Sequence, residues 1–166
     1  YTYDALGQRL TEQSPALAAA GQQSQLRYDL LGRLNRRTEP EGVTEWVFDV
    51  VADGNLGRGR LYSESYKGIT TIHRHAPGDF GRISSRLTVI DGVSYESTYT
   101  YNSYGQLLSE TYPGGFSVTH QYNALGYHER VQDGEGAISY YQLLATDAQG
   151  RTTVEWKGDG STMAVS

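Results

Sequence analysis

Hydrophobic and polar positions alternate most clearly in the middle of the chain, where they predict two strands. Residues 82–90 and 93–101 are rich in β-branched and aromatic side chains, and Asp91-Gly92 lies between them. In the second stretch the tyrosines share one face, and threonines and a glutamate occupy the other, which is the period of an extended strand. Asp and Gly tolerate the positive φ that tight hairpin turns require. The pattern therefore predicts an antiparallel β-hairpin over residues 82–101.

This hairpin belongs to a repeat marked by tyrosine, an acidic or amide residue, and glycine. The segment Tyr-Thr-Tyr-Asp-Ala-Leu-Gly at 1–7 recurs at 26–32, 99–105 and 120–126, and in decayed form at 144–150. Two further copies carry insertions, one running from Trp46 to Gly59 and one from His73 to Gly81. The residues that mark the repeats are Tyr3, Asp4, Gly7, Tyr28, Asp29, Gly32, Arg33, Phe48, Asp49, Gly59, Gly81, Tyr101, Gly105, Tyr122, Gly126 and Gly150. Successive marker glycines lie 21 to 27 residues apart, within the range of repeat architectures.

A second glycine-rich turn falls about halfway through each unit, as at Pro113-Gly114-Gly115. Each unit therefore reads turn, strand, turn, strand. We predict an all-β protein in which antiparallel hairpins, each carrying this tyrosine–aspartate motif, stack into a long twisted or coiled β-strip. The chain is expected to be one repeat region over 1–166 with about six repeats, at 1–25, 26–45, 46–70, 71–98, 99–119 and 120–143, and a partial copy at 144–166. A short helix candidate, Pro15–Ala20 after Ser14, is interpreted as a loop insertion in the first unit.

Sheet building accounts for every part of the marker motif. Two tyrosines spaced by two residues point to the same face of a strand, and cross-strand aromatic pairs each stabilise a sheet by ~0.2–1 kcal/mol. The Asp or Asn that follows can accept hydrogen bonds from its own downstream backbone and start a turn. The glycine three positions later fits a left-handed or bulged position without steric cost. None of these roles requires catalysis.

Composition narrows the choice of function. The 166 residues include 14 tyrosines, 20 glycines and no cysteine, so disulfides and thiolate metal sites are excluded. The net charge is −5 without any basic block, which argues against nucleic-acid binding. No apolar run approaches the roughly 18 residues of a membrane-spanning helix. The chain starts at Tyr1 in the middle of a repeat, so we expect it to be a piece of a longer protein.

Candidate chemistry is sparse. His73 and His75 would share a strand face and could hold a metal, but they also stand where other units place aromatic rings, and no third ligand is spaced for them. Asp91, Asp133 and Asp159 each adjoin a turn glycine, so turn chemistry explains them better than a calcium loop or a glycosidase pair. We therefore expect no catalytic residue, no metal site and no cofactor.

The sequence resembles the YD (RHS) repeat family. Tyr28-Asp29-Leu30-Leu31-Gly32-Arg33-Leu34 followed by Pro40-Glu41-Gly42 carries the resemblance, and the stretch from Phe48-Asp49 to Gly59-Arg60-Leu61 is similar to the expanded repeat of cocoon-forming insecticidal toxin-complex components. The resemblance implies a β-strip that spirals into a hollow shell. In bacterial polymorphic and insecticidal toxins such a shell encloses a C-terminal toxic domain, and in teneurins a similar barrel serves cell-surface adhesion. The resemblance also implies that the protein is secreted or displayed at a bacterial cell surface.

About six repeats are too few to close a shell, so the resemblance implies a non-catalytic wall segment of a larger secreted protein. Its partners would be neighbouring repeats of the same parent chain and an enclosed C-terminal toxin domain. The alternative is a module that binds carbohydrate or a cell-surface partner through exposed tyrosine faces. An enzyme is the third possibility, without a residue constellation behind it. The end repeats would present unpaired strand edges, which predicts self-association.

Overall fold

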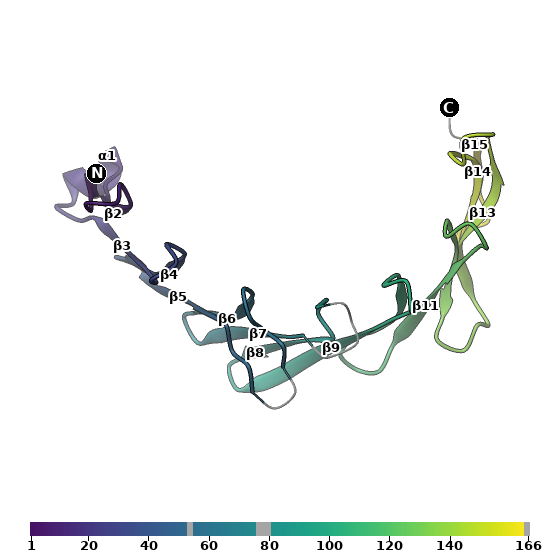
Figure 1. The fold of residues 1–166 in the computed structure, drawn as a ribbon, viewed down its shortest axis with the longest axis horizontal. Helices are drawn as coiled ribbons and strands as arrows, with labels where there is room; N and C mark the ends of the chain where they lie inside the picture. The colour runs from purple at the N-terminus through teal and green to yellow at the C-terminus, as the bar shows by residue number, and fades with distance from the viewer. Residues whose placement is uncertain (53–54, 76–80, 165–166) are drawn as a thin grey trace. The chain divides into compact units, whose positions relative to one another are not determined.

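The structure is a computed structural model that describes residues 1–52, 55–75 and 81–164. These residues form fifteen strands and one helix, and the chain divides into two units, Tyr1–Tyr95 and Glu96–Ser166. Within each unit every strand is hydrogen-bonded antiparallel to its neighbours in the sequence, so strand order follows chain order (Figure 1). The predicted all-β fold of stacked antiparallel hairpins is confirmed.

The strands are short and evenly spaced along both units. The first unit holds β1 (Thr2–Tyr3), β2 (Arg9–Glu12), β3 (Ser24–Tyr28), β4 (Leu34–Glu39), β5 (Gly42–Phe48), β6 (Leu61–Tyr66), β7 (Ile69–Arg74) and β8 (Ser85–Ile90). The strand β9 (Val93–Tyr101) starts in the first unit and continues in the second. The second unit then holds β10 (Leu107–Thr111), β11 (Ser117–Tyr122), β12 (His128–Asp133), β13 (Ser139–Thr146), β14 (Thr152–Lys157) and β15 (Thr162–Ala164).

The single helix described, α1 (Pro15–Ala19), lies in the connection between β2 and β3, as an insertion there would. The Ser14 hydroxyl caps its N-terminus by accepting a hydrogen bond from the Leu17 amide at 3.3 Å, and a proline starts the first turn. Gly21, with φ at 66°, follows the last turn. No helix in the described part of the chain is long and apolar enough to cross a membrane.

Consecutive antiparallel pairing puts alternate turns on opposite edges of each unit. We call the turns after β1, β3, β5, β9, β11 and β13 the YD turns, because each contains an Asp or Asn of the marker motif. We call the turns after β4, β6, β8, β10, β12 and β14 the mid-unit turns, because each lies about halfway through a sequence repeat. Each unit thus has a YD edge and a mid-unit edge.

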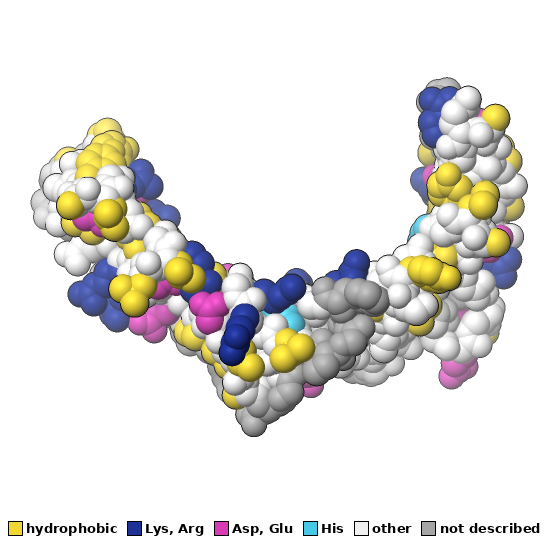
Figure 2. All heavy atoms as spheres, in the orientation of Figure 1, with side chains coloured by type: hydrophobic (Ala, Val, Ile, Leu, Met, Phe, Trp, Pro, Cys, Tyr) yellow, Lys and Arg dark blue, Asp and Glu magenta, His cyan; other side chains and the backbone are white. Residues whose placement is uncertain are grey.

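The sheet has almost no core of its own. Among the described residues Leu26 is the one large hydrophobic side chain that is buried, at 6% exposure. Figure 2 shows hydrophobic side chains at the surface along both units. Stability must therefore come from backbone ladders and from side chains that reach neighbouring repeats, as in other quasi-one-dimensional repeat proteins.

Candidate functional site

Each YD turn is closed by the side chain of its Asp or Asn. The Asn123 amide donates to the Tyr127 carbonyl and the Gly126 amide donates to the Asn123 carbonyl, both at 2.9 Å. The Asn123 side-chain oxygen also accepts from the backbone amides of Leu125 and Tyr127, both at 3.0 Å. The same four hydrogen bonds, 2.8 to 3.2 Å long, form at Asp4, Asp29, Asn102 and Asp147. The motif is therefore a self-contained turn.

Backbone geometry explains the marker glycine. All seven marker glycines have φ between 70° and 83°, a region in which a residue with a Cβ costs roughly 1–2 kcal/mol. The strand register shifts beside the aromatic residue of the motif, for example between Arg27 and Tyr28 and between Gln121 and Tyr122. Such a bulge increases local twist. The turn therefore sets both the hairpin and its twist.

The tyrosine of the motif ties its repeat to the preceding one. The Tyr28 hydroxyl donates to the Arg9 carbonyl at 2.9 Å, and the Tyr122 hydroxyl donates to the Leu107 carbonyl at 3.0 Å. Arg9 and Leu107 occupy the same position, two residues after a marker glycine. Where the third repeat has Phe48 instead of tyrosine, the Arg33 guanidinium lies 4.3 Å above its ring.

The residue after the marker glycine reaches forward to the next repeat. The Gln106 side-chain amide donates to the Gly126 carbonyl at 2.8 Å, and the Arg60 guanidinium donates to the Gly81 carbonyl. A methyl group placed on Gly32 would lie 2.8 Å from the Gln8 side-chain nitrogen, because that side chain covers the next turn. In the sequence this position is notable only as the residue that follows the marker glycine. Nothing there indicated its contact with the next repeat.

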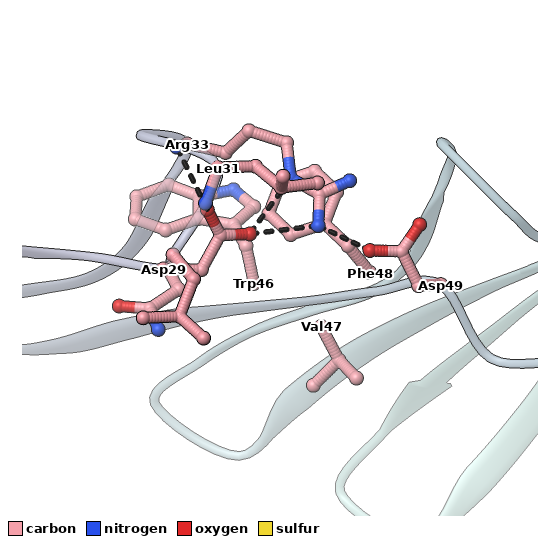
Figure 3. Close-up of a pocket in the computed structure, with 9 residues that line it drawn as sticks. Asp29, Leu31, Arg33, Trp46, Val47, Phe48 and Asp49 are labelled. Carbon is pink, nitrogen blue, oxygen red and sulfur yellow. Dashed lines mark hydrogen bonds and ion pairs between the residues drawn. The ribbon is translucent and has the colours of Figure 1, made fainter.

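At the second YD turn these contacts form a charged cluster, shown in Figure 3. Arg33 contacts the Asp29 carboxylate at 2.7 Å and pairs with Asp49. The Arg33 backbone amide, followed by its side chain, holds the pKa of Asp29 below its usual range. Arg33 does the same to the pKa of Asp49, and the two carboxylates, Asp49 first, raise the pKa of Arg33. The cluster therefore stays charged over the whole physiological pH range.

A shallow hollow of about 500 Å³ lies beside this cluster. It is lined by Asp29, Leu30, Leu31, Arg33, Asn35, Trp46, Val47, Phe48 and Asp49. A similar hollow of about 570 Å³ lies between the YD turns of the second unit and is lined by Asn102, Tyr104, Gln106, Tyr122, Asn123, Ala124, Leu125 and Gly126. The same positions of the repeat build both, so the hollows follow from the repeat rather than from one specialised site.

The expanded YD turn between β5 and β6 needs an additional closure. The Asn55 side chain donates to the Val50 carbonyl at 2.6 Å and accepts from the His75 amide at 2.7 Å. Asn55 is only 5% exposed, and the Leu56 amide donates to the His75 carbonyl at 2.6 Å. Asn55 therefore joins the expanded turn by hydrogen bonds to the chain after β7. The sequence did not indicate this role.

His73 and His75 lie where the fourth repeat passes from β7 into its turn. His73 pairs with Arg86 of β8, and His75 is buried at 6% exposure. Burial, more than the nearby arginines, lowers the pKa of both rings. Within the described ranges, no group of three His, Cys, Asp or Glu side chains could hold a metal ion. A metal ion held by His73 and His75 would therefore have no third protein ligand among the described residues.

Comparison with known proteins finds one repeat family and several solved structures of similar fold. Residues 3–44 match the family model of the RHS repeat. No curated protein sequence matches the chain. The fold resembles parts of three solved assemblies, although at 13 to 18% identity the likeness concerns the fold alone.

The first of these is the Tc holotoxin pore of Photorhabdus luminescens, with a TM-score of 0.66, 18% identity and 87% of this chain covered. The others are complexes of TcdB2 and TccC3, with Cdc42 (TM-score 0.59, 13% identity, 99% covered) and without it (TM-score 0.54, 13% identity, 87% covered). This chain spans only 8%, 12% and 10% of those three chains, respectively. The family match over residues 3–44 and the recurring YD turns confirm the resemblance of this chain to the RHS (YD) repeat family.

Proposed function

We propose that the chain is a non-catalytic wall segment of an RHS shell in a larger secreted toxin, where it helps to enclose or present a toxin or effector domain. The RHS match and the similarity to toxin-complex components support the repeat and its setting. The chain covers about a tenth of those components, so enclosure would depend on many more repeats of the parent protein.

The observation that carries this proposal is the uncovered sheet. Successive repeats are fixed to one another by the tyrosine hydroxyl and by the side chain after the marker glycine. Yet Leu26 is the single large apolar side chain buried in the described part of the chain. Monomeric proteins rarely leave apolar surface so widely open, and such surface usually meets another part of an assembly. A wall covered by further repeats or by cargo accounts for both features.

The test uses the full parent protein in native form. Its C-terminal fragment should stay with the repeat region through gel filtration and resist protease until denaturant is added. As a control, the separately purified C-terminal fragment mixed with the same repeat region should be digested at once, since it lies outside. A fragment in the parent that is cleaved and lost without denaturant would contradict enclosure.

One cluster favours the second candidate, carbohydrate binding. Tyr112 and Phe116 stack with centroids 5.9 Å apart, and Tyr140 meets Phe116 edge-on at 6.4 Å. All three rings are more than a third exposed. Exposed rings beside polar groups can stack on sugar faces. In a glycan screen, binding should weaken in Phe116→Ala and persist in Tyr104→Ala, because Tyr104 is exposed but stands apart from the cluster. Equal binding by both variants would remove this candidate.

A further inference from the structure

Two histidines of the second unit face each other across neighbouring strands. His120 lies on β11 and His128 begins β12, and their ring centroids are 5.2 Å apart. The His120 Nδ1 and His128 Nε2 atoms are separated by 3.1 Å and share one hydrogen bond. The strands bring them together through the register shift between Gln121 and Tyr122. This pairing is not evident from the sequence, since the two histidines stand eight residues apart.

Aromatic neighbours hold the pair in place. The His128 ring is parallel to the Tyr141 ring of β13 within 5°, at 5.5 Å, and also contacts Tyr122 at 5.3 Å. Tyr122 is itself fixed by its hydrogen bond to the Leu107 carbonyl. Burial lowers the pKa of both histidines, and for His128 the charge of His120 adds to the effect. The lowered pKa values favour the neutral form of both rings, which is the form in which imidazole binds metals.

We propose that His120 Nδ1 and His128 Nε2 are two adjacent ligands of one late transition-metal dication, with water completing its coordination. Imidazole nitrogen favours Zn²⁺, Cu²⁺ and Ni²⁺ over Mg²⁺ or Ca²⁺. Two nitrogens separated by 3.1 Å, each about 2.0–2.1 Å from a metal ion, subtend an angle of about 100° at the metal, between square-planar and tetrahedral values. For both nitrogens to bind the metal, the ring that donates the shared hydrogen bond changes tautomer and carries its proton on its other nitrogen, and the rings turn so that their lone pairs converge.

The surrounding charges also favour a cation. Glu110 of β10 lies near His120 and acts on it electrostatically in favour of positive charge. Residues 96–166 contain three Lys and Arg against eight Asp and Glu, a net charge of −5. Lys157 stands opposite Tyr141 in the ladder, but it pairs with Glu155 at 3.3 Å. In the first unit His75 lies near Arg60, whose charge opposes a metal ion, and at His73 the opposing effect of Arg86 exceeds the favourable effect of Glu64.

The experiment is a calorimetric titration of the 166-residue chain with Zn²⁺ at pH 7.5, with Mg²⁺ as the hard-cation control. We expect one saturable Zn²⁺ site. His120→Gln and His128→Gln should each lower the affinity at least about tenfold, because even the loss of an outer partner of a metal ligand costs about 10–100-fold. His73→Gln should leave the affinity unchanged. Circular dichroism on each variant verifies that the strands persist.

A ligand replacement guards against a purely structural effect. His128→Cys supplies a thiolate, which is a strong Zn²⁺ ligand, and should bind more tightly than His128→Gln. The proposal is overturned by the absence of saturable binding at millimolar Zn²⁺. It is also overturned if His120→Gln or His128→Gln binds as the parent chain does, or if His73→Gln loses the site to the same degree.

Discussion

The turns at 112–116 and 123–127 share two backbone hydrogen bonds but differ in side-chain chemistry. In the mid-unit turn the Tyr112 amide donates to the Phe116 carbonyl at 2.7 Å and the Gly115 amide donates to the Tyr112 carbonyl at 3.0 Å. The YD turn repeats both bonds and adds two from the Asn123 side chain. Backbone geometry alone is therefore enough to reverse the chain, and the Asp or Asn of the motif adds closure.

The glycines of the two edges differ in the same way. Gly68, Gly92, Gly114, Gly136 and Gly160 have positive φ on mid-unit turns, and a Cβ added to any of them would meet nothing within 4 Å. A Cβ on the YD-turn glycines Gly32, Gly126 or Gly150 would meet a side chain of the preceding repeat, whereas one on Gly59 of the expanded turn would meet nothing within 4 Å. The positive-φ glycine is therefore open on the mid-unit edge and is covered by the preceding repeat at the YD turns of Gly32, Gly126 and Gly150. Other glycines of the mid-unit edge, Gly134 and Gly158, do lie against the preceding repeat, at Ser117 and Tyr140.

Removing the side-chain closure of a YD turn should give the largest difference in stability between the two edges. In Asn123→Ala two turn amides lose their acceptor, which should lower the free energy of unfolding by about 1–3 kcal/mol. Urea denaturation of the 166-residue chain followed by circular dichroism measures it. Asn123→Asp keeps an acceptor oxygen and should stay close to the parent.

The matched control on the other edge is Lys157→Ala. Lys157 occupies the same turn position as Asn123, with its amide donating to the Ser161 carbonyl at 2.9 Å, but its side chain accepts no bond from the turn. Its removal should change stability by less than about 0.5 kcal/mol, as for an ordinary surface site. An effect equal to that of Asn123→Ala would mean that the two edges do not differ.

Two glycines of the second unit compare the edges directly. Gly150 on a YD turn and Gly160 on a mid-unit turn have φ of 78° and 87°, so alanine should cost about 1–2 kcal/mol of backbone strain at each. At Gly150 the new methyl group would also overlap the Tyr127 ring. Gly150→Ala should therefore be less stable than Gly160→Ala by about 1 kcal/mol or more in urea denaturation.

A double-mutant cycle isolates the contribution of that ring. If the extra loss in Gly150→Ala comes from Tyr127, it should disappear when Gly150→Ala is combined with Tyr127→Ala. Additivity of the two substitutions would show that the contact does not couple these repeats.

A smaller change removes the link that runs back to the preceding repeat. Tyr122→Phe deletes the hydrogen bond to the Leu107 carbonyl and should cost about 1 kcal/mol. Hydrogen exchange of the β10 and β11 amides should report it as local loss of protection, since opening in repeat proteins is local. Tyr140→Phe on the mid-unit edge is the control. Equal exchange in the two variants would remove the tyrosine hydroxyl from the coupling.

Local features of this fold follow from the sequence, and contacts between repeats do not. The strands at 85–90 and 93–101 follow from alternation, and the closure of a turn by Asp29 depends only on residues within four positions. The hydrogen bond from the Gln106 side chain to the Gly126 carbonyl joins residues twenty positions apart, so it depends on how two repeats are placed side by side. The same limit applies to His120 and His128, whose contact depends on a register shift.

The smallest expected effect is a pH dependence confined to the fourth repeat, where His73 and His75 replace the aromatic residues of other YD motifs. Burial lowers the pKa of both in the folded state, so the unfolded chain, with a histidine pKa near 6.5, binds protons more readily. Their contribution to stability is therefore complete above pH 6.5 and declines as pH falls through the lowered folded-state pKa. A His73→Gln/His75→Gln double variant should lose less stability than the parent between pH 7.5 and 5.5 in urea titrations. His120 and His128 titrate in both proteins, so their contribution cancels in the difference. Identical pH profiles would show that this repeat closes independently of its histidines, as the turn at 112–116 closes without an Asp or Asn.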